Sequence, residues 1–152
     1  MRLLRPVAAA DYFLKPCGLG WFATNIIGII PVARGRAKEG GNPLAECEAA
    51  LDRDDILILF PEGSRGVPEA LGLFKKGIGH LAKARANVPV IPVFMHGLGK
   101  ALPKGSALLV PFNCAVSVGE PVYGQDSYEA LVRELEAAMT ALAAQKRVPA
   151  WD

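Results

Sequence analysis

The chain has 152 residues, of which 51% are hydrophobic, and its 17 Lys and Arg against 15 Asp and Glu give a formal net charge of +2. This length allows one sizeable core, so we expect a single domain spanning residues 1–152. The near balance of charges excludes a dense basic surface for nucleic acid, while the mean hydropathy of +0.25 favours apolar surface kept for lipid or a partner.

The first predicted elements are a strand at residues 6–10 and an uncharged stretch at 16–33. The stretch reaches the lower length limit of a membrane span, but its Pro and Gly residues would leave backbone groups unpaired in hydrocarbon. We therefore expect no span, but a buried segment or shallow interfacial contact through Trp21 and Phe22. No long apolar region follows Arg2 and Arg5, so no secretory signal is expected.

Further along the chain, apolar runs alternate with helical patterns. Strands are predicted at residues 29–33, 56–60, 90–95, 108–112 and 115–118, and helices at 43–53, 71–86 and 126–146. Asn42 is the expected N-cap of the first of these helices and Asp126 that of the last. The alternation, with several strands apolar throughout, predicts an α/β fold in three layers, with a mostly parallel sheet covered by helices on both faces.

The strand at 56–60 runs directly into a loop that contains Glu62, Gly63 and Arg65. Loops beyond the carboxyl ends of parallel strands are where ligands bind in such folds. Gly63 allows close backbone approach, Arg65 offers a planar fork for phosphate, and Glu62 could orient that fork or accept a hydrogen bond from a substrate hydroxyl. Spacing alone leaves open a plain surface turn with an Arg–Glu ion pair.

A second arginine, Arg34, follows the strand at 29–33. If that strand runs parallel to 56–60, Arg34 and Arg65 leave the sheet at the same edge and open into one cleft. Two cations would then meet one dianion, which predicts a site for a phosphorylated polyol.

Several sequence blocks together resemble one family. The run FPEGSRG at residues 60–66 resembles the FPEGTR block of the phospholipid acyltransferases that make phosphatidic acid from lysophosphatidic acid, the 1-acylglycerol-3-phosphate acyltransferases, with Ser64 in place of Thr. GIIPVAR at 28–34 is similar to the family's second block and VPVIPV at 88–93 to its fourth. FKKGIGHLA at 74–82 and VGEP at 118–121 resemble its usual accompaniments, so the resemblance covers nearly the whole chain.

The resemblance implies roles for two groups of residues. The acceptor's glycerol phosphate would be held by Arg34, Glu62, Gly63, Ser64 and Arg65, and the acyl site would be walled by Val88, Pro89, Val90, Ile91, Pro92 and Val93. It further implies an O-acyltransferase of phospholipid biosynthesis that takes its acyl group from acyl-CoA or acyl-carrier protein and needs no cofactor or metal. Its acceptor would be a lysophospholipid, and it would work peripherally at the membrane surface, on the cytoplasmic side.

The family's first block, an Asn-His with an Asp four residues after the His, does not occur in these residues. His80 is followed four positions later by Ala84, and His96 by Lys100, so neither has the acidic partner. Because this block precedes the second one in the family, we expect it upstream of Met1 and expect no catalytic residue within the chain, which would be truncated at its N-terminus. Acyl transfer to an alcohol needs a base for the hydroxyl proton, so we expect weak or absent turnover. A non-catalytic lysophospholipid- or phosphate-binding remnant is the alternative.

Two other motifs suggest different functions, but the sequence matches them less well. A relaxed dinucleotide-binding fingerprint at residues 18–23 is crowded by Trp21 and Phe22, and a serine-hydrolase elbow at Ser64 has Glu62 where its first glycine should stand. The three cysteines, at positions 17, 47 and 114, have neither the spacing of a zinc site nor the even number of a disulfide framework, which fits a reducing compartment.

Overall fold

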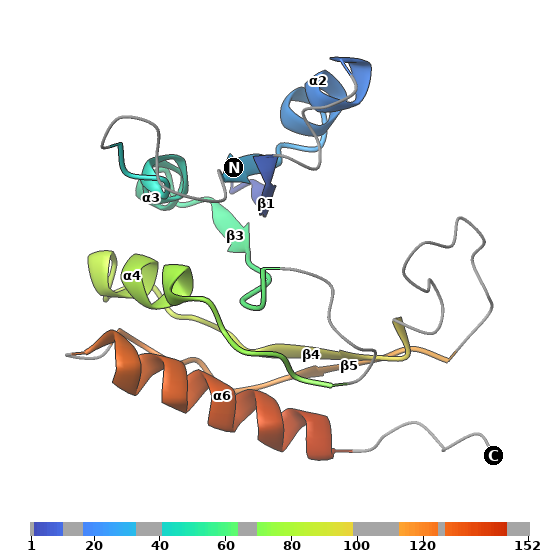
Figure 1. Ribbon diagram of the computed structural model, residues 1–152, viewed down its shortest axis with the longest axis vertical. Helices are drawn as coiled ribbons and strands as arrows, with labels where there is room; N and C mark the ends of the chain where they lie inside the picture. The colour runs from blue at the N-terminus through green and yellow to red at the C-terminus, as the bar shows by residue number, and fades with distance from the viewer. Residues whose placement is uncertain are drawn as a thin grey trace. The chain divides into compact units, whose positions relative to one another are not determined.

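The computed structural model describes residues 2–10, 17–32, 41–63, 70–98, 113–124 and 127–145 (Figure 1). The chain divides into two compact units, Met1–Gly63 and Ser64–Asp152. Each unit has its own strands and helices, and each is described by itself below. The expectation that they make up a single domain remains a prediction.

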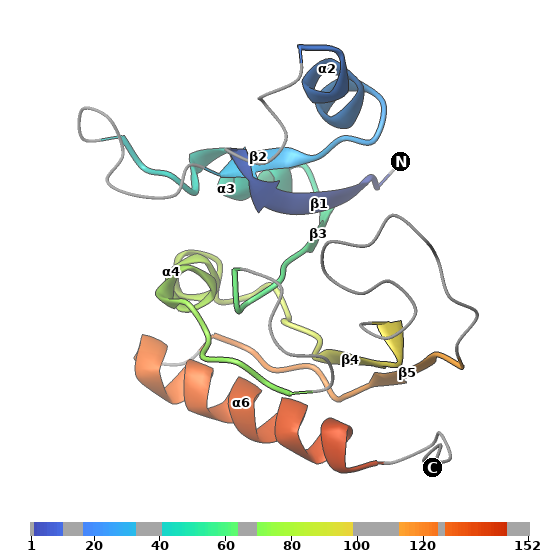
Figure 2. The ribbon, with the colours of Figure 1, turned by 45° about the vertical axis from the view of Figure 1, so that its right-hand side comes forward.

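The first unit is built on a parallel sheet. Strands β1 (Leu4–Ala9), β2 (Ile30–Val32) and β3 (Ile56–Ile58) lie in the order β2-β1-β3. Parallel neighbours need a crossover between them, and helices α2 (Cys17–Asn25) and α3 (Ala45–Asp52) lie in these two connections (Figure 2). The predicted α/β class and parallel sheet are therefore confirmed, and each strand overlaps the range expected from its apolar run.

The two helices of this unit differ from the sequence expectation. Helix α2 was not predicted, because its glycines disfavour a helix and no capping pattern precedes it. Helix α3 lies inside the predicted range 43–53, but its N-cap is Leu44 and not Asn42. The Asn42 side chain instead accepts a hydrogen bond from the Leu44 N–H at 3.0 Å, in a turn before the helix. Among the described helices, none has both the length and the apolar character needed to cross a bilayer.

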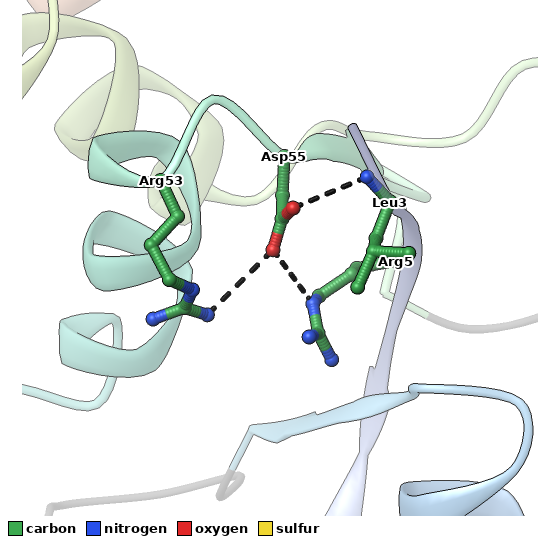
Figure 3. Close-up of polar contacts among 4 residues, drawn as sticks. All are labelled: Leu3, Arg5, Arg53 and Asp55. Atoms are coloured by element: carbon green, nitrogen blue, oxygen red, sulfur yellow. Dashed lines mark hydrogen bonds and ion pairs between the residues drawn. The ribbon is translucent and has the colours of Figure 1, made fainter. Parts of the chain in front are cut away.

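A buried carboxylate, Asp55, ties the start of β3 to β1 (Figure 3). One of its oxygens accepts from the Leu3 N–H at 3.2 Å, and the other accepts from Arg5 Nε at 2.8 Å and lies 3.7 Å from Arg53 Nη2. The hydrogen bond from Arg5, assisted by the Leu3 N–H, holds the pKa of Asp55 below its ordinary value. A buried charge is tolerated only with such partners, so this cluster fixes the register of β1 against β3.

Replacing this carboxylate tests its role in stability. Asp55→Asn should lower the melting temperature near pH 7 by about 5 °C or more, because the buried ion pair loses one partner. Since the folded-state pKa of Asp55 is lowered, its contribution is complete above the ordinary aspartate pKa and is lost as pH falls through the folded value. Circular dichroism melts should therefore show the gap between wild type and variant closing in acid.

The adjacent Asp54 provides the matched control. It is exposed and has φ 60°, a conformation that asparagine also tolerates. Asp54→Asn should leave the melting temperature nearly unchanged. An equal loss in both variants would mean that the local turn, and not the Asp55 ion pair, sets stability.

The second unit consists of an antiparallel pair of strands and two helices. Strands β4 (Val93–His96) and β5 (Ala115–Val118) pair antiparallel, and Val90 and Val122 form a further antiparallel bridge. Helices α4 (Lys76–Ala84) and α6 (Tyr128–Ala144) lie side by side (Figure 1), where α6 packs on β4 and α4 packs on α6. Their core comprises Ala82, Val122, Leu131 and Leu135, with Phe74, Ile78 and Val90 packed against it. The parallel direction expected for most strands thus does not extend to this pair, and the predicted strand at 108–112 lies outside the described residues.

Local contacts explain where the helices of this unit begin. The cap of α6 is Ser127, whose Oγ accepts from the Ala130 N–H at 3.1 Å. The expected cap, Asp126, lies outside the described residues. Helix α4 begins at Lys76, later than the predicted residue 71, without a side-chain cap, and Phe74 packs on the core before the helix starts.

Candidate functional site

The carboxyl ends of β2 and β3 lie at one edge of the first sheet, since both strands run parallel to β1. β1 lies between them, so the two strands are roughly 10 Å apart across the sheet. β2 pairs with residues 7–9 of β1 and β3 with residues 4–6, so their carboxyl ends are also offset by three residues, roughly 10 Å along the strand direction. Val32, the last residue of β2, pairs with Ala9, and Ile58, the last residue of β3, pairs with Pro6. The chain that follows β3 therefore emerges beyond the same edge as the chain that follows β2, which is the arrangement expected for a ligand site in an α/β fold.

Glu62 is held in a tight turn directly after β3. The Gly63 N–H donates to the Phe60 carbonyl at 2.9 Å, which closes a four-residue turn with Pro61 at its second position. Pro at that position and Gly at the fourth both favour such a turn, and Gly63 has φ 67°, which a residue with a side chain rarely adopts.

The carboxylate of Glu62 is half-buried, and within the described residues it has no hydrogen-bond or ion-pair partner. Its pairing with a guanidinium or a substrate hydroxyl stays a prediction. The Gly63 N–H already serves the turn, so Gly63 acts at this site through its backbone shape.

The other three residues of the predicted phosphate site lie outside the described residues. These are Arg34, which follows Val32 by two positions, and Ser64 and Arg65, which follow the Glu62 turn. The structure thus describes where β2 ends and where the Glu62 turn lies, and the shared cleft for the two arginines stays a prediction.

The predicted acyl-site wall, residues 88–93, is an extended segment with two different faces. Val88 and Val90 are half-buried and Pro92 is buried, and Val90 packs against the core formed with α4 and α6. Pro89, Ile91 and Val93 are exposed on the other face. The wall role itself stays a prediction, and any contact with an acyl chain falls on these three exposed residues.

The same exposed face continues across the β4–β5 pair. Met95 and Val93 on β4 lie opposite Val116 and Val118 on β5, and all four side chains are exposed. Sequence reasoning missed Met95, Val116 and Val118 as members of this apolar face. The sequence carries no signal for it, because β4 is apolar at Val93, Phe94 and Met95 alike, and in β5 the polar Ser117 is buried while its apolar neighbours are exposed.

The two histidines lie in different surroundings. His80 is exposed and stacks on the Tyr128 ring, with centroids 5.5 Å apart. His96 lies at the end of β4 against Phe94, and its buried Nε2 has no hydrogen-bond partner among the described residues. In the described part of the chain, no carboxylate bonds to either imidazole, so no His–Asp pair is present there.

A depression of about 370 Å³ lies elsewhere in the first unit. It is lined by Arg5, Thr24, Ile29, Ile30, Pro31, Glu46, Ala49 and Arg53. None of the predicted substrate residues contributes to it, and its two arginines already face Asp55. Because Glu46 and Asp55 balance these two cations, we assign no anionic ligand to it. Within the described residues, no group of three potential ligands could hold a metal ion.

Relatives with known activities are similar to most of the chain. The chloroplastic 1-acyl-sn-glycerol-3-phosphate acyltransferase of Brassica napus is 34% identical over 119 residues, which are 78% of this chain and 34% of that protein. The human 1-acyl-sn-glycerol-3-phosphate acyltransferase alpha is 29% identical over 119 residues, or 78% of this chain and 42% of that protein. The chain thus spans about a third of the length of the first of these relatives and less than half of the second.

The fold is also similar to a solved structure. The crystal structure of the 1-acyl-sn-glycerophosphate acyltransferase of Thermotoga maritima matches with a TM-score of 0.71 at 20% identity, over 99% of this chain and 68% of that one. This likeness confirms the fold predicted from sequence. The family model described as Acyltransferase matches residues 2–96. Because that match covers more than half of the residues, the chain belongs to the acyltransferase family.

Proposed function

We propose that this chain is the acceptor-binding part of an O-acyltransferase of phospholipid biosynthesis. The reaction moves a fatty acyl group from acyl-CoA or acyl-carrier protein to 1-acylglycerol-3-phosphate and gives phosphatidic acid. The observation that carries the proposal is the Glu62 turn, which follows β3 at the edge of the sheet where β2 also ends. Family membership and the activities named for the relatives support it.

In this proposal the Glu62 turn and the two arginines bind different parts of the acceptor. Arg34 and Arg65 hold the phosphate dianion, each through charge-assisted hydrogen bonds. Glu62, half-buried and without a partner in the described residues, orients the Arg65 guanidinium or accepts a hydrogen bond from the glycerol hydroxyl. Ser64 adds a hydroxyl beside the phosphate.

The acyl group would lie on the exposed apolar face of the second unit. Pro89, Ile91 and Val93 face outward there, and the face continues through Met95, Val116 and Val118. Binding of a hydrocarbon chain to such a surface is favoured by a free energy of about 25 cal/mol for each Å² of apolar area removed from water. No metal or cofactor takes part in this scheme.

This proposal predicts acceptor binding without efficient acyl transfer. The 152-residue sequence does not contain the His–Asp pair of the family pattern, and among the described residues no histidine bonds to a carboxylate. The 152-residue chain therefore binds its acceptor but transfers acyl groups slowly or not at all. A lysophospholipid- or phosphate-binding remnant without any catalytic role is the second candidate, and it shares the same phosphate site. We place either protein peripherally on the cytoplasmic side of a membrane.

A calorimetric comparison of two acceptors tests the proposed site. A short-chain lysophosphatidic acid that stays monomeric should bind at least about tenfold more tightly than the monoacylglycerol with the same acyl chain, because only the former offers a charged phosphate to the arginines. Equal affinity for the two compounds would show that the chain recognises the acyl group alone, which would remove the acceptor-binding proposal. Inorganic phosphate serves as a competitor and should displace only the phosphorylated compound.

A further inference from the structure

Helix α4 carries a row of basic side chains on its exposed face. Lys76, His80 and Lys83 are all exposed, and their spacing of four and then three residues places them on one side of the helix. From Lys76 to Lys83 the helix rises by roughly 10 Å. We call these three residues the α4 row. Helix α4, which is described throughout, exposes no large apolar side chain beside them, so this face of the helix is polar.

The first residue of α6 holds the α4 row in place. The His80 ring stacks on the Tyr128 ring with centroids 5.5 Å apart, and Lys76 Nζ lies 5.9 Å from the centroid of the same ring. Gly79 allows the two helices to approach each other here, because a Cβ at this position would lie only 3.0 Å from Tyr128 Cβ. Two members of the row are thus positioned before a partner binds, which lowers the entropic cost of binding.

The charge of this surface is mostly positive. Residues 70–119 contain no Asp or Glu, and in the described part of the chain neither Lys76 nor Lys83 forms an ion pair. Glu129, in the first turn of α6, lies near both lysines. A hydrogen bond from the Tyr128 side chain, and after it the charges of Lys76 and Lys83, lower the pKa of Glu129. The two ammonium groups therefore act on one place, where this carboxylate offsets only part of their charge.

A row of charges on a helix face suits an acidic protein better than a small anion or a bilayer. Small ligands bind in concave sites, whereas the α4 row stands exposed on the outside of a helix. A bilayer contact would need apolar side chains beside the cations, and α4 exposes none that is large. Complementary charges on two protein surfaces, in contrast, steer the encounter and fix its register.

The proposed function leaves two acyl donors open, and only one of them is a protein. Acyl-carrier protein is acidic, whereas acyl-CoA is a nucleotide. The unit that contains α4 also carries the exposed apolar face on which we place the acyl group. We propose that the α4 row binds an acidic face of acyl-carrier protein and thereby favours this protein as the donor. The choice of partner rests on the proposed function, but the contact needs neither acyl transfer nor lysophosphatidic acid.

Binding of the carrier protein tests this contact directly. Acyl-carrier protein that has its phosphopantetheine arm but no acyl group should bind the 152-residue chain in isothermal titration calorimetry at low ionic strength. Because no acyl chain is present, the exposed apolar face does not contribute to the signal. Binding should weaken as salt is added, since exposed charges make the contact.

Variants of opposite sign locate the contact. Lys76→Gln/Lys83→Gln should weaken binding by roughly tenfold or more, because two charge pairs are lost. Arg2→Glu, at an exposed residue of the other unit, changes the net charge by the same amount and should leave binding unchanged. Glu129→Gln removes the carboxylate that offsets the two lysines and should tighten binding. Circular dichroism should show all three variants folded.

Several results would overturn the proposal. These are absence of carrier-protein binding at low salt, an equal loss in Arg2→Glu and in the lysine variant, and no gain in Glu129→Gln. Displacement of the carrier protein by free coenzyme A would assign the α4 row to a nucleotide phosphate instead, and binding of anionic vesicles with the same dependence on the lysines would assign it to lipid. Lysophosphatidic acid binding is measured separately, so its loss with carrier-protein binding retained would contradict the proposed function and not the α4 contact.

Discussion

Arg65→Ala should weaken lysophosphatidic acid binding by the 152-residue chain by roughly one to two orders of magnitude. A phosphate dianion taken out of water between two guanidiniums needs both of them, because each supplies charge-assisted hydrogen bonds and the loss of one leaves a desolvated charge partly unpaired. Isothermal titration calorimetry with the monomeric short-chain compound measures the change. Arg65→Lys keeps the charge but loses the planar fork, so its affinity should fall between those of wild type and Arg65→Ala.

Two further variants decide whether the arginines share one phosphate. Arg133→Ala removes an exposed arginine of α6 and should leave binding unchanged, which controls for the loss of net charge. Arg34→Ala should weaken binding as Arg65→Ala does, and the double variant should lose less than the sum of the two single losses, because residues that hold one group are coupled. Strictly additive losses would place the two arginines at separate sites and would contradict the shared cleft.

Acyl transfer by the 152-residue chain should be slower by a factor of about 10² to 10⁴ than that of a version extended upstream to include the Asn-His and Asp of the family pattern. That range is what the loss of a general base costs when the acceptor is still positioned. A steady-state assay with an acyl thioester donor and lysophosphatidic acid compares the two versions, while calorimetry should give them similar acceptor affinities. Binding without turnover in one version and with turnover in the other would separate the enzyme from the non-catalytic remnant.

The extended version carries its own control. Replacing its added His by alanine should return the rate to that of the 152-residue chain. If the 152-residue chain already matches the extended version, a base within it performs the reaction, and His80→Gln and His96→Gln are the variants that would locate it. If neither version transfers acyl groups, the enzyme proposal fails and the binding proposal is judged by calorimetry alone.

The strands were predictable because each overlaps an apolar run bounded by Pro, Gly or charge, and β5 (Ala115–Val118) coincides with its predicted range. Strand β1 begins two residues earlier than predicted and includes the charged Arg5. Strand direction was not predictable from these runs, since an apolar run has the same appearance in either orientation. The antiparallel pairing of Phe94 with Ser117 therefore emerges only from the structure. Helix α2 was not predicted because Gly18 and Gly20 have low helix propensity. In the structure, burial of Ala23 stabilises the helix despite these glycines.

The Glu62 turn could be placed from sequence because Pro61 and Gly63 each fit one position of a tight turn. The Asp55 cluster could not, since Arg5 lies 50 positions away from Asp55 and no local pattern links them. The division of residues 88–93 into a core face and an exposed face could not be predicted from sequence either. VPVIPV is apolar at every position, so only packing separates Val90 from Ile91.

The order β2-β1-β3 has a consequence for synthesis of the chain. The central strand β1 is made first, and both of its neighbours come later, β3 as late as Ile56–Ile58. A ribosome-bound chain that ends before Asp55 carries β1 with one edge unpaired and Arg5 without its carboxylate. Unpaired strand edges are sites of association with other chains. The nascent first unit is therefore most exposed to misassembly until β3 leaves the exit tunnel, and the sheet and its ion pair are completed in one late step.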